Sequence, residues 1–131
     1  MRSLVLLLLL GACAGAPPPC AGLPANPMLR AELLFGRTSH GAPVAEPDWR
    51  RFLAETVTPR FPDGFTVLDG YGQWRQPATG NIVAEPSTVL LVLAPEGAAT
   101  LNSLETIRAE YRRRFAQDSV GLVLAPSCAA F

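Results

Sequence analysis

The segment from Thr88 to Leu93 constrains the fold more than any other. It reads Thr-Val-Leu-Leu-Val-Leu, with β-branched residues and leucines at both odd and even positions. Successive side chains of a strand point to opposite faces, so this strand would be apolar on both of them. Strands of this kind lie inside a sheet and are covered by other elements. We therefore expect a central strand here, in a sheet that the rest of the chain completes.

Three further segments have strand patterns. Leu29–Arg37 has apolar residues on both faces, which favours another inner strand. Phe65–Trp74 follows a Pro-Asp-Gly turn, and Gly70 and Gly72 interrupt its alternation, which indicates a bulge or a close backbone approach. A hairpin-type loop at 76–81 follows, and strand pairing is expected to resume at Ile82, ahead of the Thr88–Leu93 segment. Ser119–Leu124 is expected to be the last strand, ended by Pro126.

Two segments have the spacing of amphipathic helices. The first begins at Pro47 and ends before Pro59, and the second covers about 16 residues. Their apolar stripes consist of Trp49, Phe52, Leu53, Thr56 and Val57, and of Leu101, Leu104, Ile107, Tyr111 and Phe115. Thr38–Ala45 is expected to be a loop.

The resulting order is β-α-β-β-α-β, which predicts an α+β domain with the ferredoxin-like fold over residues 29–131. In that fold, both helices cover one face of a four-stranded antiparallel sheet. The other face must be solvated or must be buried against a partner, which offers a route to a homodimer or to a complex with another protein. Residues 13–28 are rich in Pro and Ala and are expected to form an extended linker.

Residues 1–12 are expected to be a signal peptide. Arg2 precedes an apolar run, Leu4–Leu10, that is too short for a permanent membrane span. Leu10-Gly11-Ala12-Cys13 resembles the bacterial lipobox, which implies lipidation of Cys13 and a stable membrane anchor. Ala14 stands where an Asp would favour the inner membrane, so we expect a periplasm-facing lipoprotein of the outer membrane. The alternative is ordinary secretion of a soluble periplasmic protein, with Cys13 discarded.

The two remaining cysteines, Cys20 and Cys128, lie near the two ends of the exported chain. Export leads to an oxidising compartment, where such a pair is expected to form a disulfide. Two free thiols are the alternative.

Several segments together resemble an uncharacterised bacterial family of secreted proteins and lipoproteins, domain of unknown function 3574. The resemblance covers Arg30 to Phe131 and rests on Glu32-Leu33-Leu34-Phe35-Gly36, Thr58-Pro59-Arg60-Phe61-Pro62-Asp63-Gly64, Gly72-Gln73-Trp74-Arg75, Glu85-Pro86-Ser87 and Phe115-Ala116-Gln117-Asp118-Ser119-Val120. It implies a cysteine near each end of the domain but no known activity. This chain has Ala45 and Glu46 where a hydroxyl-bearing helix cap is expected, which weakens the first helix cap.

Composition excludes several functions. Eleven basic residues balance eleven acidic ones, so no general attraction to nucleic acid exists. The single histidine, His40, lies in a Ser-His-Gly loop without a diagnostic acidic partner, and no Cys/His cluster predicts a metal. No phosphate-binding or nucleophile motif is present, so we predict no cofactor and no catalytic residue. Arg112–Arg114 is read as a solvated helix face, and 117–119 as a helix end and turn.

The best candidate binding residues are Tyr71, Gln73, Trp74 and Arg75, together with Glu85 across the hairpin. Trp offers a flat apolar face, Arg a planar fork for carboxylates, and Gln both a donor and an acceptor. The competing and favoured interpretation is structural, with Trp74 packed on the sheet and Arg75 paired with Glu85.

Two functions follow from these predictions. The first is a lipid-anchored cell-envelope binding or interaction module that uses the open face of its sheet. The alternative is a small envelope enzyme with a pocket on that face, lined by Tyr71, Gln73, Arg75 and Glu85. A flat apolar face would favour the first function, and a closed polar pocket with converging Arg and Glu would favour the second.

Overall fold

The computed structural model describes residues 20–131. The predicted signal peptide, Cys13 and the first part of the predicted linker lie outside the described residues. The long elements are β1 (Asn26–Gly36), α1 (Glu46–Phe52), β4 (Thr66–Arg75), β5 (Ile82–Ala94), α2 (Ala98–Phe115) and β6 (Gly121–Ala129). A π-helical turn, η1 (Leu53–Val57), extends α1, so the predicted first helix is present.

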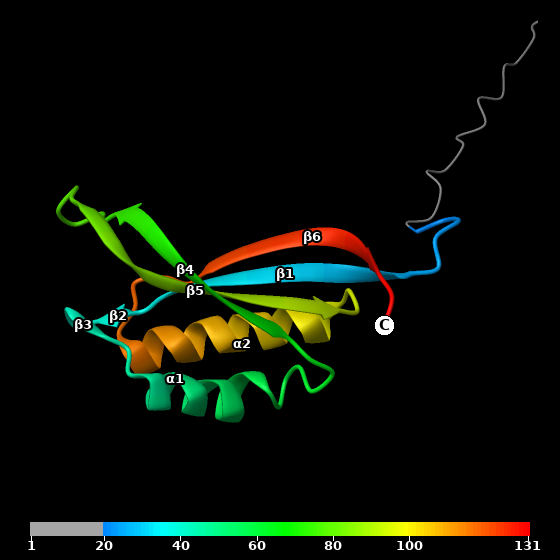
Figure 1. The fold of residues 1–131 in the computed structure, drawn as a ribbon, viewed down its shortest axis with the longest axis horizontal. Coiled ribbons are helices and arrows are strands. Elements are labelled where there is room, and N and C mark those ends of the chain that lie inside the picture. Colours follow the sequence, from blue (N-terminus) through cyan, green and yellow to red (C-terminus); the bar gives the residue numbers. More distant parts are fainter. Residues whose placement is uncertain (1–19) are drawn as a thin grey trace, which may run out of the picture.

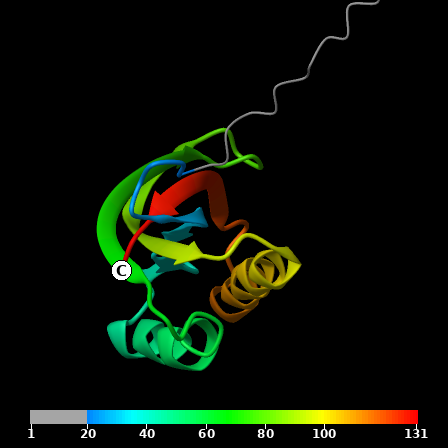
Figure 2. The ribbon, with the colours of Figure 1, turned by 90° about the vertical axis from the view of Figure 1, so that its right-hand side faces the viewer.

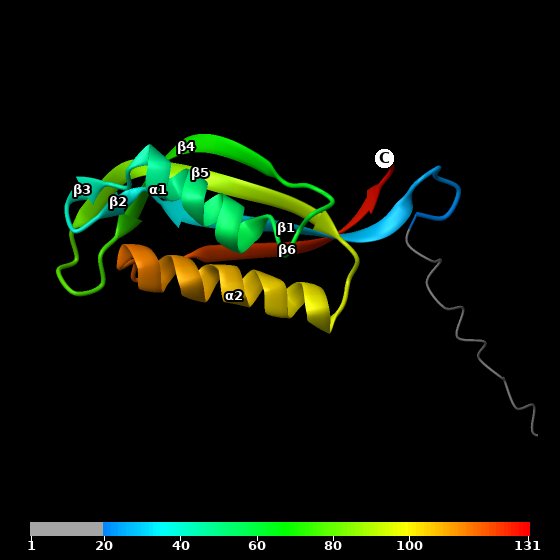
Figure 3. The same cartoon turned by 90° about the horizontal axis from the view of Figure 1, so that it is seen from below.

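The four long strands form one antiparallel sheet in the order β4-β5-β1-β6. Both helices lie on the same side of this sheet, as Figure 1 and the view from the helix side in Figure 3 show. The end-on view in Figure 2 shows the sheet curving over the helix pair. The predicted ferredoxin-like α+β fold is confirmed, with the Thr88–Leu93 segment in β5 between β4 and β1.

The core lies between the sheet and the helices. Phe35 of β1 meets Tyr111 of α2 edge to face, with ring centroids 4.6 Å apart, and also contacts Trp49 and Phe52 of α1. Aromatic pairs with this geometry stabilise a core beyond the area they bury. The stripes predicted from helical spacing supply the buried residues of both helices, but the inclusion of Leu101 was wrong, because this residue is 44% exposed.

Three boundaries differ from the sequence predictions. The first strand begins at Asn26, because Asn26, Pro27 and Met28 pair with the end of β6. The last strand continues through Pro126 to Ala129, because β6 is an edge strand, where a residue without an N–H is tolerated. The predicted loop before α1 contains a short hairpin, β2 (Thr38–Ser39) with β3 (Ala42–Pro43).

The predicted cysteine pair forms a disulfide. Cys20 and Cys128 are bonded, with Cα atoms 5.6 Å apart, and they are separated by 108 positions in sequence. Cys128 pairs with Pro27 in the β1–β6 ladder, so the bond fastens the segment before β1 to the end of the last strand.

Candidate functional site

One face of the sheet carries no helix, and we call it the open face. Along β1, Ala31, Leu33 and Phe35 are buried toward the helices, so the pleat directs the alternate residues to the open face. Those residues are Arg30, Glu32, Leu34 and Gly36. The β1 register aligns Leu34 with Val89 of β5 and Gly121 of β6.

The centre of the open face is apolar and exposed. Leu34, Leu68 and Val123 have 42%, 50% and 48% of their surfaces exposed. Val89 lies between Leu34 and Leu68 in the strand register. Contiguous exposed apolar surface of this kind typically marks an interaction site.

A small recess lies at one end of the open face, and we call it the Glu85 recess. Its volume is about 310 Å³, and Trp74, Glu85 and Gln117 contribute side chains to its lining. Small residues from all four long strands and from the loop before β6 also border it: Gly36, Gly72, Ser87, Ser119 and Gly121. Of the two glycines predicted to interrupt the second strand, Gly72 borders this recess.

The Glu85 carboxylate is the buried polar group of this recess, with 8% of the residue exposed. Its Oε1 accepts a hydrogen bond from the Trp74 indole Nε1 at 2.9 Å, and its Oε2 accepts one from the Thr38 backbone N–H at 3.1 Å. No ion pair within residues 20–131 includes Glu85. The carboxylate is therefore held by neutral donors alone.

Gly36 is required for this arrangement. A Cβ at this position would lie 2.7 Å from Glu85 Oε1 and 2.9 Å from Gln117 Oε1. Both oxygens therefore occupy the space that any larger residue would fill. The sequence segment Glu32–Gly36 ends in the one residue type that leaves room for a buried carboxylate.

Gln117 connects the recess to the end of α2. Ala116 has the left-handed conformation that ends the helix, and the Gln117 backbone N–H donates to Arg112 O. The Gln117 side-chain Nε2 donates to Thr38 O, beside the donor to Glu85. The segment 117–119 thus turns the chain as predicted, and it also lines the recess.

Tyr111 supports the recess from the helix side. Its hydroxyl donates to Gly36 O at 2.7 Å, and burial raises the pKa of this phenol above its ordinary value. A phenol in this environment stays protonated, so Tyr111 acts as a fixed donor that positions the end of β1.

The five predicted binding residues separate into two groups. Trp74 and Glu85 come together on one face of the sheet. Glu85 pairs with Gly72, and Trp74 lies two residues after Gly72, on the same side of β4. Tyr71, Gln73 and Arg75 alternate with these residues and belong to the opposite side of β4, although Gln73 also borders the recess. Tyr71 is 71% exposed.

The expected pairing of Arg75 with Glu85 was wrong. Arg75 is aligned with Ile82, and the partner of Glu85 is the Trp74 indole. Sequence reasoning did not associate Gly36, Thr38 or Gln117 with the site. Gln117 lies 79 residues from Thr38, and no local pattern signals that contact.

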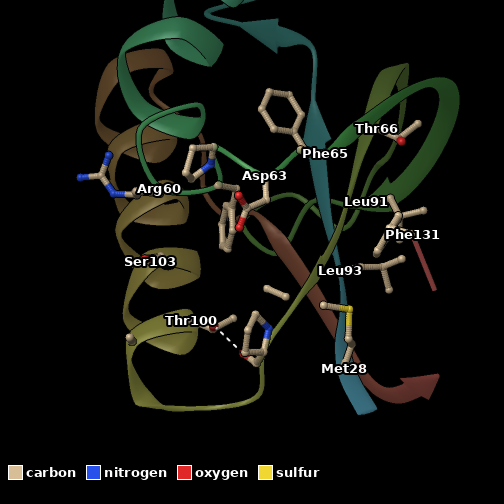
Figure 4. A pocket seen from close by; sticks show the side chains of 16 residues that line it. Met28, Arg60, Asp63, Phe65, Thr66, Leu91, Leu93, Thr100, Ser103 and Phe131 are labelled. Atoms are coloured by element: carbon tan, nitrogen blue, oxygen red, sulfur yellow. Dashed lines mark hydrogen bonds between the residues drawn. The ribbon is translucent and has the colours of Figure 1, made fainter. Parts of the chain in front are cut away.

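A larger cavity of about 690 Å³ lies at the other end of the sheet (Figure 4). Its lining is mainly apolar and includes Phe61, Phe65, Leu91, Leu93 and Phe131. Arg60 donates to Thr56 O, and Thr100 donates to Pro95 O, so these polar groups serve the local backbone. In Figure 4, Arg60 points away from the β5 side of the cavity. The cavity extends the apolar surface of the open face through Leu91 and Leu93.

The arginines at the end of α2 form ion pairs on the helix surface. Arg113 and Arg114 pair with Glu110 on α2, and Arg114 also reaches Glu55, as expected for a solvated helix face. His40 is exposed in the β2–β3 turn. Residues 20–131 contain no His, Cys, Asp or Glu cluster suited to a metal ion. In the same range, neither α1 nor α2 has the length and hydropathy that a bilayer-spanning helix needs.

Comparisons with known proteins support the fold and the family. A phage SAM lyase in complex with S-methyl-5'-thioadenosine is similar with a TM-score of 0.61 and 16% identity, over 78% of this chain and 90% of that chain. A phage SAM lyase in the apo state is similar with a TM-score of 0.57 and 15% identity, over 80% and 92% of the two chains. These likenesses concern the fold. The search of curated proteins gave no match.

The family resemblance found in the sequence is confirmed. A family model described as "Protein of unknown function (DUF3574)" matches residues 30–131, from β1 to the end of the described structure. The chain therefore belongs to the DUF3574 family of proteins of unknown function.

Proposed function

We propose that this chain is a lipid-tethered binding module of the bacterial cell envelope whose open face associates with a second copy of the chain. One observation carries the proposal: the sheet face opposite the helices exposes Leu34, Leu68 and Val123, and Val89 lies between the two leucines. Burial of such a patch against another surface is favourable, because it removes apolar area from water.

The charges on the open face favour a second copy as the occupant. Arg30 and Glu32 form an ion pair at 2.6 Å on β1. Glu32 has the apolar Val123 and Leu91 as its neighbours on β6 and β5. A two-fold axis near these residues would bring Arg30 of each copy to Glu32 of the other, as isologous interfaces require. The face is thus complementary to itself in charge and in hydropathy.

Two observations support the proposed address. The Leu10–Cys13 segment has the sequence of a lipidation signal. The bond between Cys20 and Cys128 suits an oxidising compartment outside the cytoplasm. A tether at Cys13 would hold many copies on one membrane surface, where a high local concentration favours self-association.

The experiment compares sedimentation of the wild type with two leucine variants. Leu68→Glu places a charge on the open face, whereas Leu101→Glu changes a leucine of similar exposure (44%) on α2. We expect the wild type and Leu101→Glu to dimerise and Leu68→Glu to remain monomeric. Equal association of all three proteins would contradict the proposal, as would a monomeric wild type.

A second candidate function is an enzyme that acts in the Glu85 recess. The buried Glu85 carboxylate and the Trp74 indole, which meet in a cavity, favour this candidate. This cavity differs from the pocket predicted from the sequence, which was lined by Tyr71, Gln73, Arg75 and Glu85. The shared fold with a phage SAM lyase suggests SAM as the first substrate to assay. Formation of S-methyl-5'-thioadenosine by the wild type but not by Glu85→Gln would support this candidate, and no turnover would exclude this reaction.

A further inference from the structure

We propose that the Glu85 recess binds a small organic cation, such as a primary amine attached to a single aromatic ring. This inference goes beyond self-association and does not depend on it. It shares its site with the second candidate function, but it concerns binding and needs no turnover.

The Glu85 carboxylate is the group that would bind the cation. A carboxylate this deeply buried is normally paired with a cation, because desolvation of an isolated charge is costly. An ionised carboxylate can accept about four hydrogen bonds. Within residues 20–131, Glu85 accepts two, both from neutral N–H groups. Accepting capacity and negative charge both remain for a ligand.

The neighbouring cation is engaged elsewhere. Arg37 donates to Thr88 Oγ1 and pairs with Glu46 on the helix side of the sheet. Its guanidinium also lies over the Trp49 ring, 4.5 Å from the centroid. Arg37 follows Gly36 directly, yet its side chain lies on the opposite side of β1 from the recess, where it pairs with Glu46.

The other lining groups suit a cation with an apolar body. Trp74 supplies an indole, whose face attracts cations, and its N–H bond to Glu85 holds the ring beside the carboxylate. Gln117 Oε1 and Glu85 Oε1 converge above Gly36, at 2.9 Å and 2.7 Å from the position of a hypothetical Cβ. An ammonium group has three donors and no acceptor, which matches two converging oxygens. Asp118 at the border adds negative charge.

The volume limits the ligand. About 310 Å³ is at the lower end of the range of ligand pockets, roughly 300 to 1,000 Å³. A single ring with a short aminoalkyl chain suits this size.

The test uses phenethylamine and its neutral analogue 2-phenylethanol as probes of the wild-type protein at pH 7. The chain has two tryptophans, Trp49 in the core and Trp74 in the recess, so their indole N–H resonances report on different places. We expect the amine to shift the Trp74 resonance at concentrations at which the alcohol has no effect. Equal responses to both probes, or no response to the amine, would overturn the proposal.

The charge dependence is tested with Glu85→Gln, and Asp69→Asn is the control because it removes an exposed carboxylate from the same hairpin. We expect Glu85→Gln to weaken amine binding by about tenfold or more, since a hydrogen bond to a charged group is lost. Asp69→Asn should bind as the wild type does. An unchanged affinity of Glu85→Gln for the amine refutes the assignment. If that variant fails to fold, the comparison of the amine with the alcohol in the wild type still shows whether the site prefers a cation.

Leu68→Glu separates this proposal from self-association. The variant should lose dimerisation and retain the preference for the amine over the alcohol. If Leu68→Glu loses both amine binding and dimerisation, the claim that one chain carries an independent binding site is refuted.

Discussion

The Cys20–Cys128 disulfide should be a major source of stability, because it closes almost the whole domain. The bond joins residues 108 apart, and the entropy lost by the unfolded chain on closing such a loop corresponds to about 5 kcal/mol. Neither cysteine belongs to the buried core, so replacing them removes little packing. The loss expected in the double variant is therefore mainly the loss of the cross-link.

The expected change in melting temperature follows from the size of the domain. At about 2.1 cal/mol/K per residue, a domain of about 110 residues has an unfolding entropy of about 0.23 kcal/mol/K, so 5 kcal/mol corresponds to about 20 °C. We expect Cys20→Ser/Cys128→Ser to melt about 20 °C below the oxidised wild type in calorimetry. The reduced wild type should melt with the double variant.

The control is Cys13→Ser, which should leave the melting temperature unchanged because Cys13 is outside the predicted disulfide. A fall of less than about 5 °C in the double variant corresponds to about 1 kcal/mol and would refute the loop-closure reasoning. A mass measurement of the non-reduced protein that found free thiols at positions 20 and 128 would contradict the bond itself.

Three shorter predictions concern other parts of the molecule. Tyr111→Phe should destabilise the domain by about 1 to 3 kcal/mol in urea unfolding, because Gly36 O loses its buried donor; an unchanged midpoint would contradict this. Hydrogen bonds from Arg113 hold the Glu110 pKa below its ordinary value of 4.5, so the ionised carboxylate stabilises the fold above that pH, and this contribution is lost as the pH falls through the lowered pKa. The melting temperature of Glu110→Gln should therefore fall less on acidification than the melting temperature of the wild type does. Parallel profiles of melting temperature against pH would refute the assignment. Cys13→Ala should release the protein from membranes in cell fractionation, and continued retention would exclude the lipid anchor.

The fold was largely predictable, because its elements have local signals. Helical spacing of Leu104, Ile107 and Tyr111 predicts a buried stripe whatever the partner is, and the structure buries all three against the sheet. The extension of β6 past Pro126 was not predictable in this way. It depends on β6 being an edge strand, which is a property of the sheet order and not of the segment.

The site was only partly predictable, because it depends on register and on distant contacts. Tyr71 to Arg75 is distinctive in sequence, yet alternation divides it, and only Trp74 shares a face with Glu85. Gln117 reaches the recess from the end of α2, and α1, β4, β5 and α2 separate it in sequence from its partner Thr38. The residue types indicated a binding cluster near the hairpin. Which residues belong to that cluster could be determined only from the strand pairing.

The most direct test of the central claim, that the open face binds a second copy, uses charge reversal and mixing. Arg30→Glu gives a face with two acidic residues, and Glu32→Arg gives a face with two basic residues. Loss of the exposed intramolecular pair should cost little stability. In sedimentation equilibrium, we predict that each variant alone is monomeric and that an equimolar mixture forms the heterodimer. Association of each variant as strong as that of the wild type, or a mixture that stays monomeric while the wild type dimerises, would contradict the proposal.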